Sequence, residues 1–168
     1  MQAIDQLPDI GLIEHILTHY HDRHRAQLPE LIRLSKRVEL VHGGVPACPA
    51  GLTALLEKLQ EDLFAHMDKE EEILFPMIAR QLGAAVMRPV DIMRHDHAVH
   101  IELLEEIRAL TANITAPVGA CSSWRTLYAG LAQFTTDLME HIHLENDVLF
   151  ARIDALAPGA RASAVEKT

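Results

Sequence analysis

Apolar residues recur every three or four positions along four stretches of the chain, which is the spacing of helices that bury one face. These stretches predict helices over roughly 9–42, 51–82, 89–113 and 122–157. Segments rich in glycine and proline separate them, as expected for connecting loops. Four long helices joined by short loops predict an all-α chain, an up-down-up-down four-helix bundle that forms a single domain over residues 1–168.

Two of the predicted helices carry polar residues on faces that are otherwise apolar. In the second predicted helix the stripe of positions three or four apart runs through Leu52, Leu55, Leu59, Leu63, His66, Glu70, Ile73 and Met77. The stripe of the fourth predicted helix runs through Leu127, Leu131, Phe134, Leu138, His141, Glu145 and Val148. Since the histidines and glutamates lie in line with leucines, we expect their side chains to point into the core.

Both histidine–glutamate pairs belong to one motif, HxxxExxxLFxxI, which begins at His66 and again at His141. A His and a Glu four residues apart lie on one helix face, about 6 Å apart along the axis, so both can reach one metal site. One HxxxE could arise by chance in a chain with 11 histidines. A second copy within the same apolar frame is much stronger evidence for a metal site.

Two further histidines complete an internal repeat of the chain. His21 precedes His66 by 45 residues, and His97 precedes His141 by 44. The stripe of the third predicted helix places His97 in line with Met93, Ile101, Leu104 and Ile107. A bundle with this repeat would bring six metal ligands together near its middle: His21, His66, Glu70, His97, His141 and Glu145.

The chemistry of these side chains favours two iron ions. Burying two carboxylates without a cation costs several kcal/mol each, so a metal-free polar core is a poor alternative. Two glutamates can bridge two cations about 3.5–4 Å apart, with the imidazoles at the outer positions. Imidazole and carboxylate ligands without thiolate suit iron better than a closed zinc site, with manganese as an alternative. We therefore expect a non-haem di-iron centre bridged by an oxo or hydroxo group. Its HxxxE spacing differs from the ExxH spacing of ferritin-like di-iron proteins.

Composition and charge argue against several other functions. The formal charge is −9 and no cluster of Lys and Arg could neutralise a row of phosphates, so nucleic acid is not an expected partner. The N-terminus lacks a signal-peptide pattern and no apolar run is long enough to span a membrane, so we expect a cytoplasmic protein without a membrane partner. Cys48 and Cys121 are the only cysteines, and we expect them to be reduced.

These motifs resemble those of hemerythrin-type (HHE) domains and, in detail, the di-iron domain of the iron–sulfur cluster repair proteins. The resemblance covers nearly the whole chain, through segments 20–25, 27–32, 69–78 and 143–150. It implies a hemerythrin-like bundle in which the six residues named above bind iron. It also implies a role in recovering iron–sulfur clusters after nitrosative or oxidative stress, with dioxygen or nitric oxide and damaged iron–sulfur proteins as partners.

Two functions remain open at this point. The chain could be a di-iron stress factor that repairs clusters, supplies iron to them or handles nitric oxide; alternatively, it could be a module that reversibly binds or senses a diatomic gas. No residue has the neighbours of a catalytic nucleophile, so the sequence assigns no enzymatic reaction. Full-length repair proteins carry a cysteine-bearing segment before the four helices, and the first predicted helix here begins close to Met1. We therefore expect a shorter relative that keeps the iron and gas chemistry.

Other residues near the motifs are expected to support the fold. Pro29 is expected to kink or locally break the first helix. His42 would lie roughly 31 Å from His21 along that helix, so we do not expect it to bind the metal. Phe75 and Phe150 are expected to pack near the site.

The remaining polar residues near the site are expected to lie outside the ligand set. His24 is expected to pack beside the ligands or to orient them. Glu71 and Glu72 are expected to point away from the site. The other histidines are expected to be solvated or at helix edges: His15, His19, His95, His100 and His143.

Overall fold

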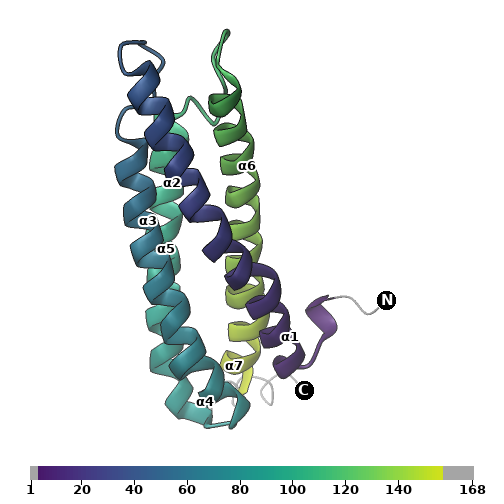
Figure 1. Cartoon of the computed structure of the whole chain (residues 1–168). Helices are drawn as coiled ribbons and strands as arrows, with labels where there is room; N and C mark the ends of the chain where they lie inside the picture. The colour runs from purple at the N-terminus through teal and green to yellow at the C-terminus, as the bar shows by residue number, and fades with distance from the viewer. Residues whose placement is uncertain (1–3, 157–168) are drawn as a thin grey trace, which may run out of the picture.

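The computed structural model describes residues 4–156, which form four helical rods packed side by side without a strand (Figure 1). The predicted all-α bundle is therefore confirmed. The first rod contains α1 (Asp9–Ile16), η2 (Leu17–His21) and α2 (Asp22–His42), and a short turn, η1 (Ile4–Gln6), precedes it. The second rod contains α3 (Leu52–Lys69), η3 (Glu70–Leu74) and α4 (Phe75–Ala79). The third rod contains the turn η4 (Gly83–Val86) and α5 (Met87–Leu110). The fourth rod contains α6 (Ser122–His143), η5 (Leu144–Leu149) and α7 (Phe150–Leu156).

The rods differ from the predicted ranges by a few residues at their ends. The second rod ends at Ala79 rather than at residue 82, because Gln81 and Gly83 adopt positive φ angles of 52° and 55°. In the third rod the helix α5 begins at Met87 rather than at 89, and it ends at Leu110 rather than at 113. Residue 157, the last of the fourth predicted range, lies outside the described residues.

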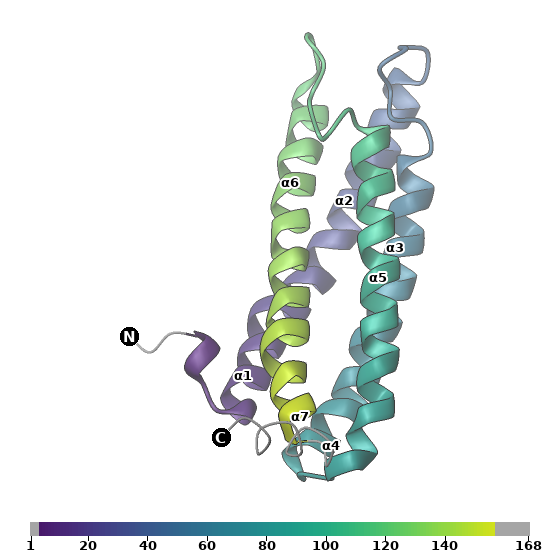
Figure 2. The ribbon, with the colours of Figure 1, turned by 180° about the vertical axis from the view of Figure 1, so that it is seen from behind.

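Side-chain size sets the spacing of the rods. α2 packs against α3 and α6, and α3 also packs against α5. A Cβ atom added to Gly130 of α6 would lie 2.8 Å from Cδ2 of Leu31 of α2, so the missing side chain allows the close approach of these two helices. Viewed from behind, α6 and α5 run along the bundle beside each other (Figure 2).

The first rod is not broken at Pro29. α2 is one α-helix from Asp22 to His42, with Pro29 in its interior. Proline removes a single backbone donor. The buried side chains of Leu28 and Leu31 hold the helix to the core on both sides of it, and the predicted break is therefore absent.

Three of the four rods become π-helical at the level of the predicted metal ligands, in η2, η3 and η5. A π turn closes its hydrogen bonds over one more residue than an α turn, so the buried face beyond it moves by one position. Ile73, on the predicted stripe, is 52% exposed, whereas its neighbour Leu74 is 1% exposed. In the same way Leu149, the last residue of η5, is fully buried, whereas Val148 is only half-buried. The two predicted stripes are therefore wrong beyond the glutamates.

The apolar core falls into two clusters along the bundle. One cluster includes Leu59 and Phe134, and the other includes Leu12, Phe75 and Phe150. In each rod, the predicted metal ligands lie at the boundary between the residues of these clusters. The site is therefore enclosed by apolar packing towards both ends of the bundle.

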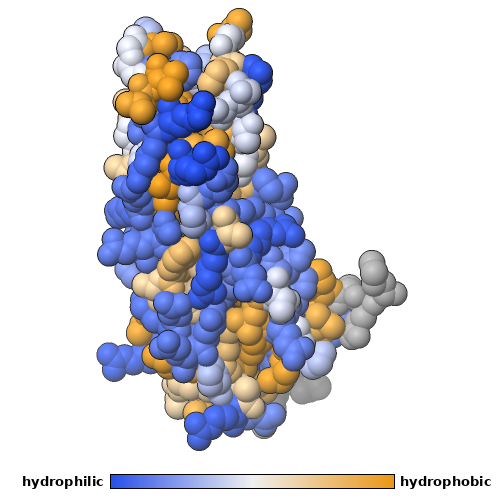
Figure 3. All heavy atoms as spheres, viewed as in Figure 1, coloured by the Kyte–Doolittle hydropathy of each residue, from blue (hydrophilic) through white to orange (hydrophobic). Residues whose placement is uncertain are grey.

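Polar residues cover most of the molecular face in Figure 3, with apolar residues scattered among them. Near its end α2 exposes Leu40 and Val41. None of the described helices combines the length and the apolar character that a membrane crossing needs.

Candidate metal centre

The structure brings all six predicted ligands together inside the bundle. The first and third rods each contribute one histidine, and the second and fourth rods each contribute a histidine–glutamate pair. None of the six is more than 1% exposed: His21, His66, Glu70, His97, His141 and Glu145. Side chains from every rod therefore meet in one enclosed place.

The atoms that face inward form two groups, which we call subsite A and subsite B. Subsite A has Nε2 of His21 and His141, 3.2 Å apart, and subsite B has Nε2 of His66 and His97, 3.1 Å apart. Both groups include the same two glutamates, and within each group one ligand atom of every residue lies within 4.8 Å of the others.

The two carboxylates lie between the subsites. Oε2 of Glu70 is 3.4 Å from Nε2 of His21 and 3.3 Å from Nε2 of His66. Each oxygen of Glu145 is 3.0 Å from an imidazole Nε2, one in each subsite. Carboxylates shared in this way can bridge two cations.

Three of the four imidazoles are supported from behind, at Nδ1. The pairs are His21 with Oε1 of Glu71 at 2.8 Å, His66 with Oδ2 of Asp96 at 3.4 Å, and His97 with Oδ1 of Asn146 at 2.9 Å. An Nδ1–H that donates to such an acceptor fixes the ring and leaves a lone pair on Nε2. Nδ1 of His141 is buried and has no partner among the residues that the structure describes.

The inner atoms fit cations better than they fit one another. When the imidazoles are neutral and protonated at Nδ1, the lone pairs of the facing imidazole nitrogens and carboxylate oxygens repel at separations of about 3 Å. Within the described part of the chain, neither oxygen of Glu70 has a hydrogen-bond partner, and nor does Oε2 of Glu145. Buried acceptors without partners destabilise a fold unless a cation satisfies them. Both donor type and geometry therefore suit metal binding.

Without metal, the charges in the site shift the pKa values in opposite directions. Burial lowers the pKa of His66, but the Glu70 carboxylate and the hydrogen bond to Asp96 outweigh burial and raise the pKa to about 10. Burial raises the pKa of Glu145, but the charge of His141 and the hydrogen bond between His141 and Oε1 of Glu145 hold the pKa of Glu145 well below its usual range. Metal ions that enter the site must therefore displace protons from imidazole nitrogens.

The family assignment follows from the sequence that builds this site. Residues 12–153, which include all six predicted ligands, match the model of the hemerythrin HHE cation binding domain. The chain belongs to this hemerythrin HHE family. Binding of cations is thus the shared property of the family, and in this HHE chain the buried histidines and glutamates are the groups suited to it.

Curated relatives of this HHE chain carry a more specific description. The chain is 52% identical over 147 residues to the iron-sulfur cluster repair protein YtfE of Yersinia pseudotuberculosis serotype IB, and 51% identical to YtfE of Yersinia pestis strain Pestoides F. Each alignment covers 88% of this chain and 66% of the relative. The chain thus spans just under two thirds of the length of these repair proteins.

The acceptors behind the imidazoles were not found from sequence. Glu71 was expected to point away, but its side chain accepts from His21 and from Nη1 of Arg25, at 2.7 Å. The π turn that begins at Glu70 rotates the next residues relative to an α-helix, which brings Glu71 towards the site. Asp96 is next to a predicted ligand, and this adjacency was the only signal for its role.

His100 lies deeper in the bundle than the sequence predicts. It was expected at a helix edge, but it is 1% exposed, and its ring lies 5.1 Å from that of His66. His100 follows His97 by three residues, which places it on the buried face of the helix. The predicted stripe includes Ile101 at this level, but Ile101 is only half-buried. Burial and the charges of neighbouring histidines lower the pKa of His100 to about 3.

His24 packs against the ligands, as expected, with its ring 5.4 Å from that of His141. Burial and the charge of His141 lower its pKa to about 3. The other histidines outside the site are partly or largely exposed: His15, His19, His95 and His143. Phe75 and Phe150 stack on two of the predicted ligands, with ring centroids 5.9 Å from His21 and 6.1 Å from His97.

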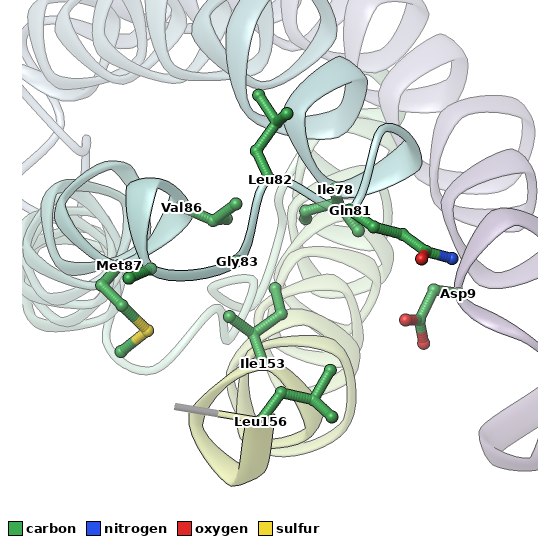
Figure 4. A pocket seen from close by; sticks show the side chains of 10 residues that line it. Asp9, Ile78, Gln81, Leu82, Gly83, Val86, Met87, Ile153 and Leu156 are labelled. Atoms are coloured by element: carbon green, nitrogen blue, oxygen red, sulfur yellow. The ribbon is translucent and has the colours of Figure 1, made fainter. Parts of the chain in front are cut away.

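Two hollows lie apart from the ligands. A cavity of about 380 Å³ at the end of the bundle is lined mainly by apolar side chains, including Ile78, Leu82 and Ile153, and by none of the six predicted ligands (Figure 4). A smaller pocket of about 180 Å³ reaches Asp96 and His100 from the surface between α3 and α5. The ligands themselves are therefore enclosed.

Proposed function

We propose that the six clustered residues hold two iron ions, one in each subsite. The observation that carries this proposal is the sharing of both buried glutamates by two groups of histidines. A single ion would leave one pair of Nε2 atoms without a cation, because the two pairs of histidines form separate groups that share only the glutamates. Two bridged cations satisfy all of them.

The donor set supports iron. Each ion would receive two imidazole nitrogens and two carboxylate oxygens, which leaves octahedral positions open for an oxo or hydroxo bridge or another small ligand. Iron held in this way supplies redox chemistry and binds dioxygen or nitric oxide. The protein's own part is to orient the imidazoles through Glu71, Asp96 and Asn146 and to keep bulk water out with Phe75 and Phe150.

We further propose that this iron serves the repair of iron–sulfur clusters in the cytoplasm after nitrosative or oxidative stress. The support is the similarity to relatives named for cluster repair, over 88% of this chain. The partners would be damaged iron–sulfur proteins, which receive iron, and nitric oxide. The second candidate is reversible binding of dioxygen or nitric oxide, which the enclosure of the site by apolar residues favours.

Transfer of iron distinguishes the two functions. The iron-loaded protein is incubated anaerobically with an iron–sulfur protein from which the cluster has been removed, together with sulfide and a reductant, and cluster absorbance is followed. Repair predicts cluster formation at the expense of the protein's iron. Retention of the iron, together with a stable gas adduct that is released under argon, would instead support gas binding. The Glu72→Ala variant is the matched control, because Glu72 is exposed and should leave iron transfer unchanged.

A further inference from the structure

The internal repeat relates subsite A to subsite B residue by residue. His21 and His97 are 76 residues apart, and His66 and His141 are 75 apart. The spacing of 76 residues also relates Tyr20 to Asp96. The two halves of the centre therefore have equivalent ligands but different residues behind one of them.

Both imidazoles of subsite B are supported at Nδ1. Asp96 accepts from His66, and Nζ of Lys69 lies 3.0 Å from the same carboxylate oxygen. Asn146 accepts from Nδ1 of His97 at 2.9 Å.

Subsite A is supported on one side only. The ring of Tyr20 lies flat against the ring of His141, with centroids 5.4 Å apart and an interplanar angle of 6°. A stacked ring face restrains the imidazole but accepts no proton from its Nδ1, and no other group among residues 4–156 does so. His21 has an acceptor in Glu71, whose oxygen also accepts from Arg25, just as the Asp96 oxygen also accepts from Lys69. Within the described part of the chain, the difference between the subsites is therefore the missing acceptor of His141.

An acceptor on the outer nitrogen of a histidine makes the metal-facing nitrogen a better ligand, and its loss typically costs about 10–100-fold in metal affinity. We propose that the two subsites are unequal: subsite B binds its ion more tightly, and subsite A holds the ion that exchanges. Tyr20 and Asp96 are the positioning residues that make the difference. The inference rests on the proposed dinuclear centre and adds which of its ions can leave.

The subsites must be measured one at a time, because repulsion between neighbouring cations would separate two binding steps even at equal sites. His141→Ala leaves only subsite B intact, and His97→Ala leaves only subsite A. Metal-free samples of both variants are titrated with Co²⁺ against a competing chelator, and circular dichroism checks their helix content. We expect the His141→Ala protein to bind one Co²⁺ roughly 10–100-fold more tightly than the His97→Ala protein. Equal affinities, or the reverse order, would overturn the inference.

Substitutions of the residues that contact the outer face of the imidazoles test whether the Nδ1 acceptor causes the difference in affinity between the subsites. In the His141→Ala background, Asp96→Ala should weaken Co²⁺ binding to the level of subsite A, whereas Asp96→Asn, which keeps an acceptor like Asn146, should retain most of the affinity. Glu72→Ala in the His141→Ala background is the control and should change nothing, because Glu72 is exposed. An Asp96→Ala change without effect on the affinity would refute the assigned cause. Binding of fewer than two Co²⁺ by the unsubstituted chain would contradict the dinuclear centre itself, which is a different result from two equal subsites.

Discussion

Nε2 of His42 lies 3.2 Å from Sγ of Cys121, at the end of α2 remote from the metal centre. The His42 ring also packs on Trp124, with centroids 5.0 Å apart. This residue therefore belongs to the contacts between α2 and the start of α6, and it lies apart from the six clustered residues. Its distance from the centre follows from α2 being one unbroken helix.

We predict that His42→Ala keeps near-normal iron content, because no ligand is removed. Loss of its packing on Trp124 should lower the free energy of unfolding by about 1 kcal/mol. Iron per folded chain is measured beside His66→Ala, which should lose most of its iron. If His42→Ala strips iron as severely as His66→Ala does, the ligand set is incomplete.

Substitution of the neighbouring residues Glu71 and Glu72 by alanine should affect metal affinity differently. Glu71→Ala removes the acceptor of Nδ1 of His21 and should reduce metal affinity about 10-fold or more. Glu72 is exposed, so Glu72→Ala should leave affinity unchanged. Competition with a chelator measures both, and equal losses would show that the π turn does not aim Glu71 at His21.

The π turn also makes a prediction about stability. Leu74 is 1% exposed, so Leu74→Ala should cost about 2–5 kcal/mol in the free energy of unfolding. Ile73 is 52% exposed, and Ile73→Ala should cost well under 1 kcal/mol. Urea unfolding of the two variants compares them directly. A larger loss for Ile73→Ala would mean that the rod continues as a regular α-helix.

Acid should destabilise the metal-free protein through His24 and His100. Their folded pKa values are lowered to about 3, so between pH 6.5 and 3 the unfolded chain binds more protons than the folded chain. Stability therefore falls as the pH falls through this range. His66, with a folded pKa of about 10, is protonated in both states well below pH 6.5 and adds no slope there.

Urea midpoints of the metal-free protein at pH 6.5 and 4.5 test this dependence. The loss between these values should reach up to about 2 kcal/mol for each histidine. His24→Leu and His100→Leu should each remove part of the slope. A slope that neither substitution reduces would assign the acid sensitivity to other groups.

The clustering of the six candidate residues could be predicted from sequence because its signal is local. His66 with Glu70, and His141 with Glu145, stand at helical spacing on apolar stripes, and residues before each motif keep the α-helical period. The confirmed bundle follows from the same period. The six residues meet because all four rods place them at one level.

The surroundings of the ligands could not be predicted because they depend on departures from the regular helix. The π segments move the buried face from Ile73 to Leu74, and no periodicity argument registers an extra residue in a turn. The Nδ1 acceptors Asp96 and Asn146 come from neighbouring rods, so their roles depend on rotations of packed helices. Contacts between a histidine and an acceptor on different rods depend on the tertiary structure, which the local sequence pattern does not specify.

Metal and spectroscopic analysis of the freshly purified, folded protein tests the dinuclear iron centre most directly. Iron, zinc and manganese per chain are measured together, and Mössbauer spectra of an iron-57 sample report whether the irons are coupled. The shared glutamates predict about two irons per chain, with the spectrum of a bridged pair. Zinc or manganese in place of iron, or a single uncoupled iron per chain, would contradict the account.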